Sequence, residues 1–355
     1  MKVLKHKDPV NVSECVEKGN DNCEMTLMEF DSEPLYYKSV ILPMLAAGHE
    51  GELINWLVTI GLLRCSQRCD NIVNDTCCQG VMYWVPAKIV DIYQWQCVSC
   101  SKKRSIREDS AFQDVRCRFK DVMRILNGWC RGTDIDDMAK LLCIKKQSVN
   151  SVCKVAIETA EKYIKSNITK WKIGGPGIVV MVDTYSEGLS KLNIQENHRN
   201  TNYIKPILCL AEVKEIPTRF WVQLLDRYSN SSSEQILNNV NTSALQVIQE
   251  IVNPGSILVT NLNTKICSYK TLQSLKHLYP VIVTVEGLKR HDSMNKLLNN
   301  LETIWKPCLD VCEEAQYFCS CSRIQHFFIN VLWRQQFGNE SLETLLNQMC
   351  YNNSV

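Results

Sequence analysis

The C-terminal half of the chain alternates short apolar runs with longer amphipathic stretches, and this alternation constrains the fold more than any other feature. After the glycine-rich segment "KWKIGGPG", the run "IVVMVD" has the length and composition of a buried strand. In chain order the expected elements are the strand 178–183, two strands in "IKPILCLAEVK" and "TRFWVQLLDR", a helix over 232–252, the strand "SILVTN", a helix over 268–278, the strand 280–286 and a helix over 292–306. The pattern predicts an α/β domain.

Three strands, helix, strand, helix, strand, helix is the element order of the RNase H-like fold, which has a mixed five-stranded sheet with helices. In that fold, acidic residues at the ends of the first and fourth strands and on the last helix would hold two magnesium ions. Such ions activate a water or a 3'-hydroxyl and stabilise the leaving oxygen of an in-line phosphoryl transfer. The corresponding residues here are Asp183, Asn261 and Glu302. The second of these carries an amide instead of a carboxylate.

Residues 46–116 are expected to hold a buried helix followed by a cysteine-containing segment. The run "LINWLVTIGLL" (53–63) reads as the helix, and "MYWVPAKIVDIYQWQC" alternates in the manner of short strands. Cys97 and Cys100 then form a Cys-x-x-Cys knuckle in "CVSC". The segment is therefore similar to one half of a zinc ribbon.

A complete zinc site needs four thiolates or imidazoles, so a second pair of ligands is required. The candidates are the adjacent Cys77 and Cys78, which cannot easily chelate as a Cys-x-x-Cys pair, although Cys65 or Cys69 could supply a ligand. Two interpretations stay open. One is a structural zinc held by Cys77, Cys78, Cys97 and Cys100, and the other is a small ribbon with free buried thiols.

Residues 117–172 are expected to be helical. In "RFKDVMRILNGWC" the apolar side chains follow the spacing of one helix face. A short helix then opens at Thr133 or Asp134, a break falls at 143–145, and a longer helix follows. Two helices joined by such a turn make a candidate helix-turn-helix. An ordinary helical hairpin is the alternative, since the usual turn glycine is missing.

The second helix of a helix-turn-helix would present its first residues to the major groove of DNA. The polar residues in that position are Lys145, Lys146, Gln147, Ser148 and Asn150. These residue types suit contacts to phosphates and to base edges.

Several segments together resemble the Merlin superfamily of cut-and-paste DNA transposases and its bacterial insertion-sequence relatives. They are "WQCVSCSKKRSIREDSAF", "IGGPGIVVMVDTY", "WVQLLDRYS", "IVNPGSILVTN", "NNLETIW" and "VLWRQQFG", in the same order over about residues 52 to 350. The resemblance implies an RNase H-like transposase domain over 173–350 with an Asp-Asp-Glu metal site. It also implies a zinc-ribbon-like and helix-turn-helix region that recognises transposon ends. Residues 1–45 are left as a poorly ordered arm.

Carried over by the resemblance, the first acid of the metal site is Asp183, the second falls on Asn261, and the third is Glu302. Thr184 also stands where the family often has a further acid, and Pro307 interrupts a stretch that commonly carries a basic residue. An amide supplies no charge, whereas two divalent ions bring about four positive charges to be offset. We therefore expect weak metal binding and a loss of transposition chemistry.

The amino-acid composition limits the partners and the cellular compartment that we expect for the protein. Lys and Arg number 40 against 38 Asp and Glu, so any basic surface must be local. The 19 cysteines are an odd and scattered set in a chain too large to need disulfide staples, which favours a reducing compartment. No apolar run approaches the ~20 residues that a membrane-spanning helix needs, and no membrane partner is expected.

Three functions remain open from the sequence. The first is a transposase-derived, catalytically silent protein retained by its host, nuclear and dimeric, that binds double-stranded DNA resembling transposon ends with a salt-sensitive affinity. The second is a weakly active transposase that uses Asn261 as a poor ligand and magnesium as its cofactor. The third is an interaction protein that binds neither DNA nor metal.

Overall fold

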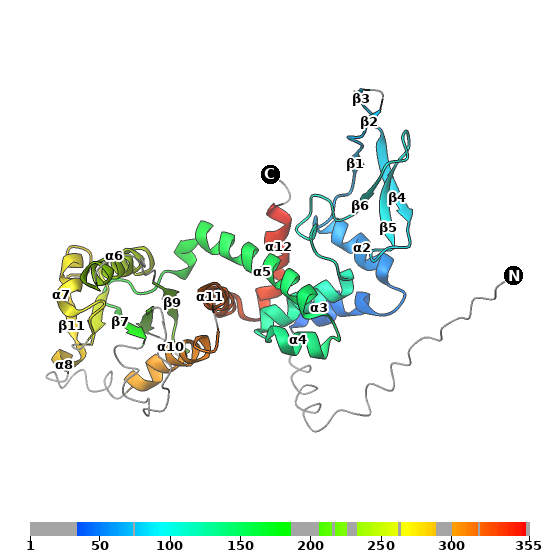
Figure 1. Cartoon of the computed structure of the whole chain (residues 1–355). Helices are drawn as coiled ribbons and strands as arrows, with labels where there is room; N and C mark the ends of the chain where they lie inside the picture. The colour runs from blue at the N-terminus through cyan, green and yellow to red at the C-terminus, as the bar shows by residue number, and fades with distance from the viewer. Residues whose placement is uncertain are drawn as a thin grey trace, which may run out of the picture.

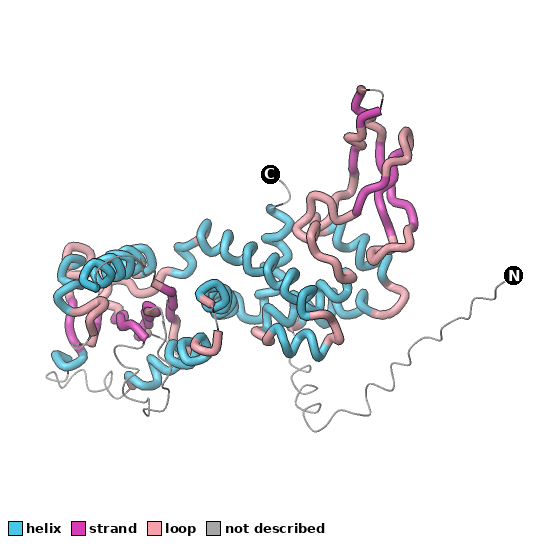
Figure 2. The backbone as a smooth tube through the Cα atoms, in the orientation of Figure 1, coloured by secondary structure: helices cyan, strands magenta, loops and turns pink. Residues whose placement is uncertain are grey.

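The structure of the protein is a computed structural model. It describes residues 34–73, 75–185, 206–214, 217–225, 233–261, 264–288, 300–318 and 320–352. These residues form a mixed α/β structure (Figure 1). A small antiparallel sheet projects at one end, a group of helices lies in the middle, and a five-stranded sheet lies at the other end (Figures 1 and 2).

The N-terminal part of the described chain is helical and packed. It consists of η2 (Tyr37–Ile41), η3 (Leu42–Leu45) and α2 (Glu50–Thr59). Tyr37, Ile41 and Leu45 are buried in the same core cluster as α2. Residues 34–45 are therefore part of the folded core, contrary to the predicted arm, because their apolar side chains are buried in contact with the rest of this cluster. The remainder of that arm, 1–33, lies outside the described residues.

The cysteine-containing segment forms an antiparallel sheet with strand order β1-β4-β5-β6. Its strands are β1 (Gln67–Arg68), β4 (Val81–Pro86), β5 (Tyr93–Cys97) and β6 (Lys103–Ser105), and a separate hairpin joins β2 (Ile72–Val73) to β3 (Thr76–Cys77). The predicted strand alternation is visible in burial, since Met82, Trp95 and Cys97 point to the buried face.

A buried ion pair fixes the loop that leads out of this sheet. Arg107 and Asp91 are only 4% and 7% exposed, and the Arg107 Nε donates to Asp91 Oδ2 at 2.7 Å. The same guanidinium donates to the carbonyl oxygens of Val115, at 2.8 Å, and Cys117, at 2.6 Å. Arg107 is the arginine of the segment "SIREDSAF", so this arginine has a structural role in holding the loop.

Three helices follow: α3 (Phe119–Arg131), α4 (Ile135–Leu141) and α5 (Lys146–Ser166). Gly132 ends α3 in the left-handed conformation with φ 77°, and the Asp134 side chain caps α4 by accepting from the Asp136 backbone N–H at 2.7 Å. The helix boundaries thus agree with those expected from the sequence, including the break before Lys146.

The larger sheet has strand order β11-β10-β7-β8-β9. Its strands are β7 (Val179–Tyr185), β8 (Ile207–Val213), β9 (Phe220–Leu224), β10 (Ile257–Thr260) and β11 (Ile282–Thr284). The pairs β7–β8 and β8–β9 are antiparallel, whereas β7–β10 and β10–β11 are parallel. The sheet is therefore mixed, as predicted. The strand expected over 280–286 is shorter, because the chain enters α8 (Val285–Leu288) at once.

Helices cover both faces of this sheet (Figure 1). On one face, Val180 and Val182 of β7 share a core cluster with α6 (Ser233–Ile251) and with α7 (Tyr269–Leu272) and η6 (Gln273–Leu275). On the other face, Met181 and Tyr185 share a core cluster with α10 (Leu301–Ala315) and with the first half of α11 (Cys321–Phe337). Alternate residues of β7 thus face different helices, as the period of a strand requires.

The last helices return to the middle of the molecule. They are α11 (Cys321–Phe337), η8 (Gly338–Glu340) and α12 (Ser341–Asn352). The Asn330 side chain donates to the Trp129 carbonyl at 2.7 Å, and the Trp171 indole donates to the Leu332 carbonyl at 3.1 Å. Helices from both ends of the chain therefore share one core. Among the described residues, no helix combines the length and apolar character required to cross a bilayer.

Candidate metal centre and nucleic-acid interface

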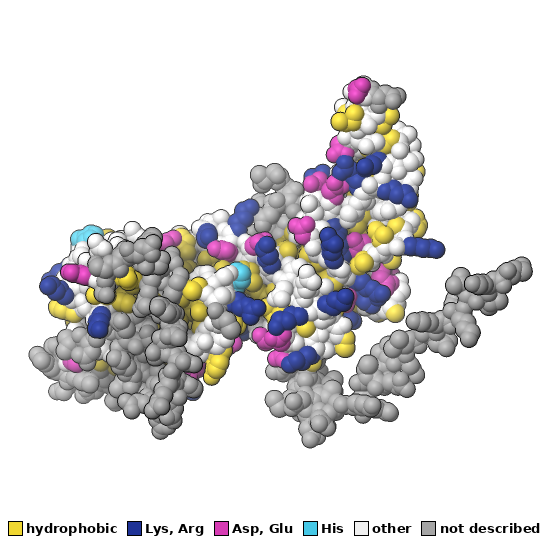
Figure 3. Space-filling view, viewed as in Figure 1, with side chains coloured by type: hydrophobic (Ala, Val, Ile, Leu, Met, Phe, Trp, Pro, Cys, Tyr) yellow, Lys and Arg dark blue, Asp and Glu magenta, His cyan; other side chains and the backbone are white. Residues whose placement is uncertain are grey.

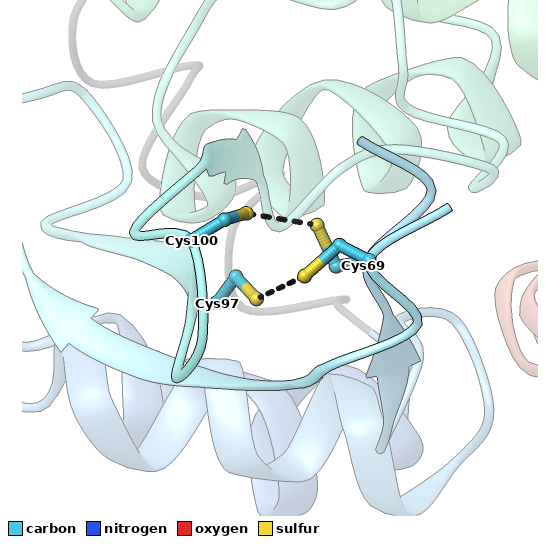
Figure 4. A group of neighbouring side chains, drawn as sticks. Cys69, Cys97 and Cys100 are labelled. Carbon is cyan, nitrogen blue, oxygen red and sulfur yellow. Dashed lines mark hydrogen bonds between the residues drawn. The ribbon is translucent and has the colours of Figure 1, made fainter. Parts of the chain in front are cut away.

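Four cysteines converge at the end of the small sheet that adjoins the β2–β3 hairpin. The Sγ atoms of Cys69, Cys78, Cys97 and Cys100 all lie within 4.8 Å of one another, and Figure 4 shows three of these side chains labelled. The Cys69 and Cys100 sulfurs are 3.5 Å apart, and those of Cys78 and Cys97 are 3.7 Å apart. Four thiolates at a Zn–S distance of about 2.3 Å in a tetrahedron have S–S separations of about 3.8 Å. The cluster therefore fits a metal such as zinc.

The local polar groups favour thiolates at part of this cluster. The backbone N–H of Cys100 is the main cause that lowers the pKa of Cys97 to about 6, with a second N–H donated by Ser99 at 3.4 Å. The pKa of Cys100 is also lowered, mainly by the backbone N–H of Lys102. Burial raises the pKa of Cys69 to about 12. A bound cation would reverse that last effect, since metal binding displaces the thiol proton.

The first pair of ligands differs from the predicted set in one member, because Cys69 takes the place expected for Cys77. Cys69 follows β1 and Cys78 follows β3, so the β2–β3 hairpin is inserted between them, with the Cys78 N–H bonded to the Asn71 carbonyl at 2.8 Å. Cys77 is exposed and ends β3. Adjacent residues of an extended chain point to opposite sides, so Cys77 and Cys78 do not face one metal together. Cys65 is also exposed and outside the cluster.

Gly80 leaves space for the Cys97–Cys100 knuckle, which packs directly against it. A Cβ added at this position would lie 2.8 Å from the Cys97 Sγ and 2.7 Å from the Ser99 Oγ. Any larger residue at 80 would therefore press on a ligand sulfur. This requirement is readable in the sequence only as a glycine close to a cysteine pair, which by itself does not point to a metal.

The expected strand-end site lies on the larger sheet. Asp183 is on β7, is 5% exposed, and accepts a hydrogen bond from the Thr184 N–H at 2.7 Å. Thr260 ends β10 and pairs with Val182, so Asn261 follows β10 at the level of Asp183 on the neighbouring parallel strand. The carboxyl ends of these two strands thus bring the carboxylate and the amide to the same edge of the sheet.

The third residue of the expected metal site, Glu302, belongs to α10, which covers the face of the larger sheet that carries Met181 and Tyr185. Glu302 is the second residue of α10, and its side chain lies outside the described part of the structure. Asp183 pairs with Cys209 of β8, which packs in the same cluster as Trp305 and Cys308 of α10. Among the side chains that the structure describes, the four cysteines are the only group of three or more metal-ligating residues close enough to share an ion.

The predicted DNA-contacting residues gather at the start of α5. Lys145, Lys146, Gln147 and Asn150 are exposed and Ser148 is half-buried, while Val149 is fully buried and anchors the turn. Lys146 also pairs with Asp136 of α4 at 2.5 Å. Figure 3 shows Lys and Arg side chains over the central helices with acidic side chains between them. Basic and acidic side chains are thus interspersed on the face of the molecule that Figure 3 shows.

Comparison with known families and with curated proteins adds no further constraint: no family model and no curated protein matches the chain.

Proposed function

We propose that the protein is a transposase-derived DNA-binding protein, similar to the Merlin superfamily, whose RNase H-like domain has lost its catalytic metal site. The observation that carries this proposal is the position of Asn261 beside Asp183 at the ends of adjacent parallel strands. Two divalent cations bring about four positive charges, and Asp183 and Glu302 offset only two of them. Because Asp183 is only 5% exposed, water screens the remaining charge poorly, so position 261 would need a carboxylate to complete the site.

The fold supports the same proposal. The order of three strands, helix, strand, helix, strand and helix over 179–315 is the order expected for an RNase H-like domain. The helix-turn-helix assignment is supported by the packing of α3 and α4 against α5 and by the exposed polar start of α5. A fold that loses its catalytic residues can persist as a binding module, since the site and its scaffold are separable.

The test compares the wild-type chain with Asn261→Asp. Calorimetric titration with Mn²⁺ should give weak or undetectable binding for the wild type and tighter binding for Asn261→Asp, because the substitution adds the missing charge. Asn253→Asp is the matched control, because Asn253 precedes β10 at its opposite end. Strong Mn²⁺ binding by the wild type, or cleavage of duplex DNA by it, contradicts the loss of catalysis.

DNA binding is tested separately from metal binding. Lys145→Ala should weaken duplex binding about equally for all sequences and lower the slope of log affinity against log salt by about 0.9, the value for one phosphate contact. Lys162→Ala, on the exposed side of α5 near its other end, serves as the control. Unchanged binding by both Lys145→Ala and Lys146→Ala would argue against the start of α5 as part of the interface.

An interaction module without DNA binding is the second candidate, and one feature favours it. A groove of about 460 Å³ runs between α4, α5 and α11. Its apolar lining includes Trp129, Ile157 and Phe327, and its rim carries acidic as well as basic groups, such as Glu314 and Arg323. A groove of mixed charge suits a peptide better than a polyanion. Failure of the wild-type chain to bind any duplex would favour this candidate.

A further inference from the structure

The outer face of the small antiparallel sheet is uncovered and free of acidic residues. The side chains on this face alternate with the buried ones along each strand. They are Arg68 of β1, Val81, Tyr83 and Val85 of β4, Gln94 and Gln96 of β5, and Lys103 and Ser105 of β6. Val81 is 59% exposed and Tyr83 is 48% exposed, so no element of the described chain packs over the middle of this face.

The strand register places these residues in rows across the sheet. Tyr83 is opposite Gln96, which is opposite Lys103. Val85, Gln94 and Ser105 form the next row in the same way. Arg68 is opposite Val81 at the other end. The centre of the face is therefore amide and apolar, and its two sides carry one positive charge each.

Three acidic residues near this sheet are engaged elsewhere. Asp70 and Glu108 both pair with Arg104, which is opposite Trp95 and so lies on the other face of the sheet. Asp91 is buried against Arg107. Within the described chain, Arg68 and Lys103 form no ion pair with these acids, so the outer face has a net positive charge.

We propose that this face enters the major groove of double-stranded DNA and reads A·T base pairs, with Gln94 and Gln96 as the residues that contact bases. The major groove admits a two-stranded β-ribbon. A glutamine side chain can pair with adenine N6 and N7 in a bidentate manner, and an apolar side chain such as Val85 contacts the thymine methyl group. Arg68 and Lys103, on the two sides of the face, are placed to contact phosphates.

The spacing along β5 is compatible with base contacts by the two glutamines. Residues two apart on a strand are separated by about 6.8 Å, which is about two base-pair steps of duplex DNA. Gln94 and Gln96 point to the same side, so they can reach base pairs at positions n and n+2. The predicted site therefore contains two A·T pairs separated by one base pair.

The cysteine cluster holds this face in shape. Cys97 ends β5 one residue after Gln96, and Cys69 follows Arg68 at the end of β1. A metal bound by the four sulfurs would tie the two strand ends together. The inference rests on the proposed DNA binding, but it uses a surface separate from the start of α5.

The experiment is selection of preferred sites by the full-length protein from a random pool of DNA duplexes, followed by affinity measurements on the selected site. Gln94→Ala and Gln96→Ala should each remove the preference for one A·T pair, by at least about fivefold, the lower end for one bidentate contact. Gln348→Ala on α12 is the matched control and should leave the preference unchanged. Zinc content and circular dichroism of each variant show that the sheet is intact.

Loss of one preferred base pair in each glutamine variant, two positions apart, supports the inference. An unchanged preference in both, while Lys145→Ala still weakens binding, overturns it and leaves the proposed DNA binding in place. Equal or tighter binding of single-stranded DNA, lost in Tyr83→Ala, also overturns it, because a stacked base would then replace major-groove reading. Absence of any DNA binding by the wild type contradicts the proposed function as well.

Discussion

At the scale of single residues, Cys69 and Cys77 are both candidate metal ligands in the sequence, but only Cys69 belongs to the cluster of four sulfurs. Cys69→Ser should lower the zinc bound per chain and weaken its retention against a chelator, because it removes one of four sulfurs. Cys77→Ser is the matched control, since Cys77 is exposed and outside the cluster. Metal analysis of the purified variants checks this. Equal zinc loss in both variants would return Cys77 to the ligand set.

Gly80 gives a second prediction at this scale. Gly80→Ala places a methyl group 2.8 Å from the Cys97 sulfur, so either the sulfur or the backbone must shift. We expect zinc affinity to fall by at least about tenfold, the usual order of effect for a change next to a metal ligand. Competition with a chelating dye measures it. Gly51→Ala is a suitable comparison, because Gly51 lies within α2 and a Cβ there would meet only the Tyr93 hydroxyl, at 3.9 Å.

At the scale of elements, the loop after β6 depends on a buried charge pair. Asp91→Ala should destabilise the protein by about 3 to 5 kcal/mol, since it leaves the Arg107 guanidinium buried without its partner. Urea unfolding of the wild type and the variant measures the difference. Asp137→Ala removes an exposed partner of Lys140 and should change stability by less than about 1 kcal/mol. A similarly small effect of Asp91→Ala would mean that Arg107 acts mainly through the Val115 and Cys117 carbonyls.

The observed helices and strands also show which element boundaries a sequence pattern can predict. The boundaries of α4 and α5 and the strand β7 agree with expectation, because capping residues and apolar periodicity are local signals. The sequence predicts that residues 34–45 belong to a poorly ordered arm, yet Tyr37, Ile41 and Leu45 are buried in the core cluster that includes α5 and α12. The strand at 280–286 ends early for a similar reason, since Val285 and Leu288 turn into the core of α10. A local sequence pattern cannot predict these contacts, because the contacting residues are distant in the sequence.

At the scale of the whole molecule, zinc binding is expected to depend on pH. The pKa of Cys97 is lowered to about 6, so above pH 6 its sulfur is mainly a thiolate that can bind metal without losing a proton. Cys69, with a pKa of about 12, and Cys78, whose pKa is also raised, each still release a proton when metal binds. The apparent zinc affinity should therefore rise about a hundredfold per pH unit between pH 6 and 8, and more steeply below pH 6. Chelator competition at several pH values checks the slope. A flat profile would mean that both sulfurs are already thiolates.

The sequence by itself determined the order of the strands in the larger sheet, the Cys97–Cys100 knuckle and the presence of an amide at Asn261, because these depend on local periodicity and on residue identity. Only the tertiary structure decided which cysteines meet, since Cys69 and Cys78 come together through a hairpin that spacing does not reveal. It also decided that Asn261 stands level with Asp183, through the register of two strands more than 70 residues apart. Register and hairpin closure are set by packing across the whole fold, so a linear pattern cannot specify them.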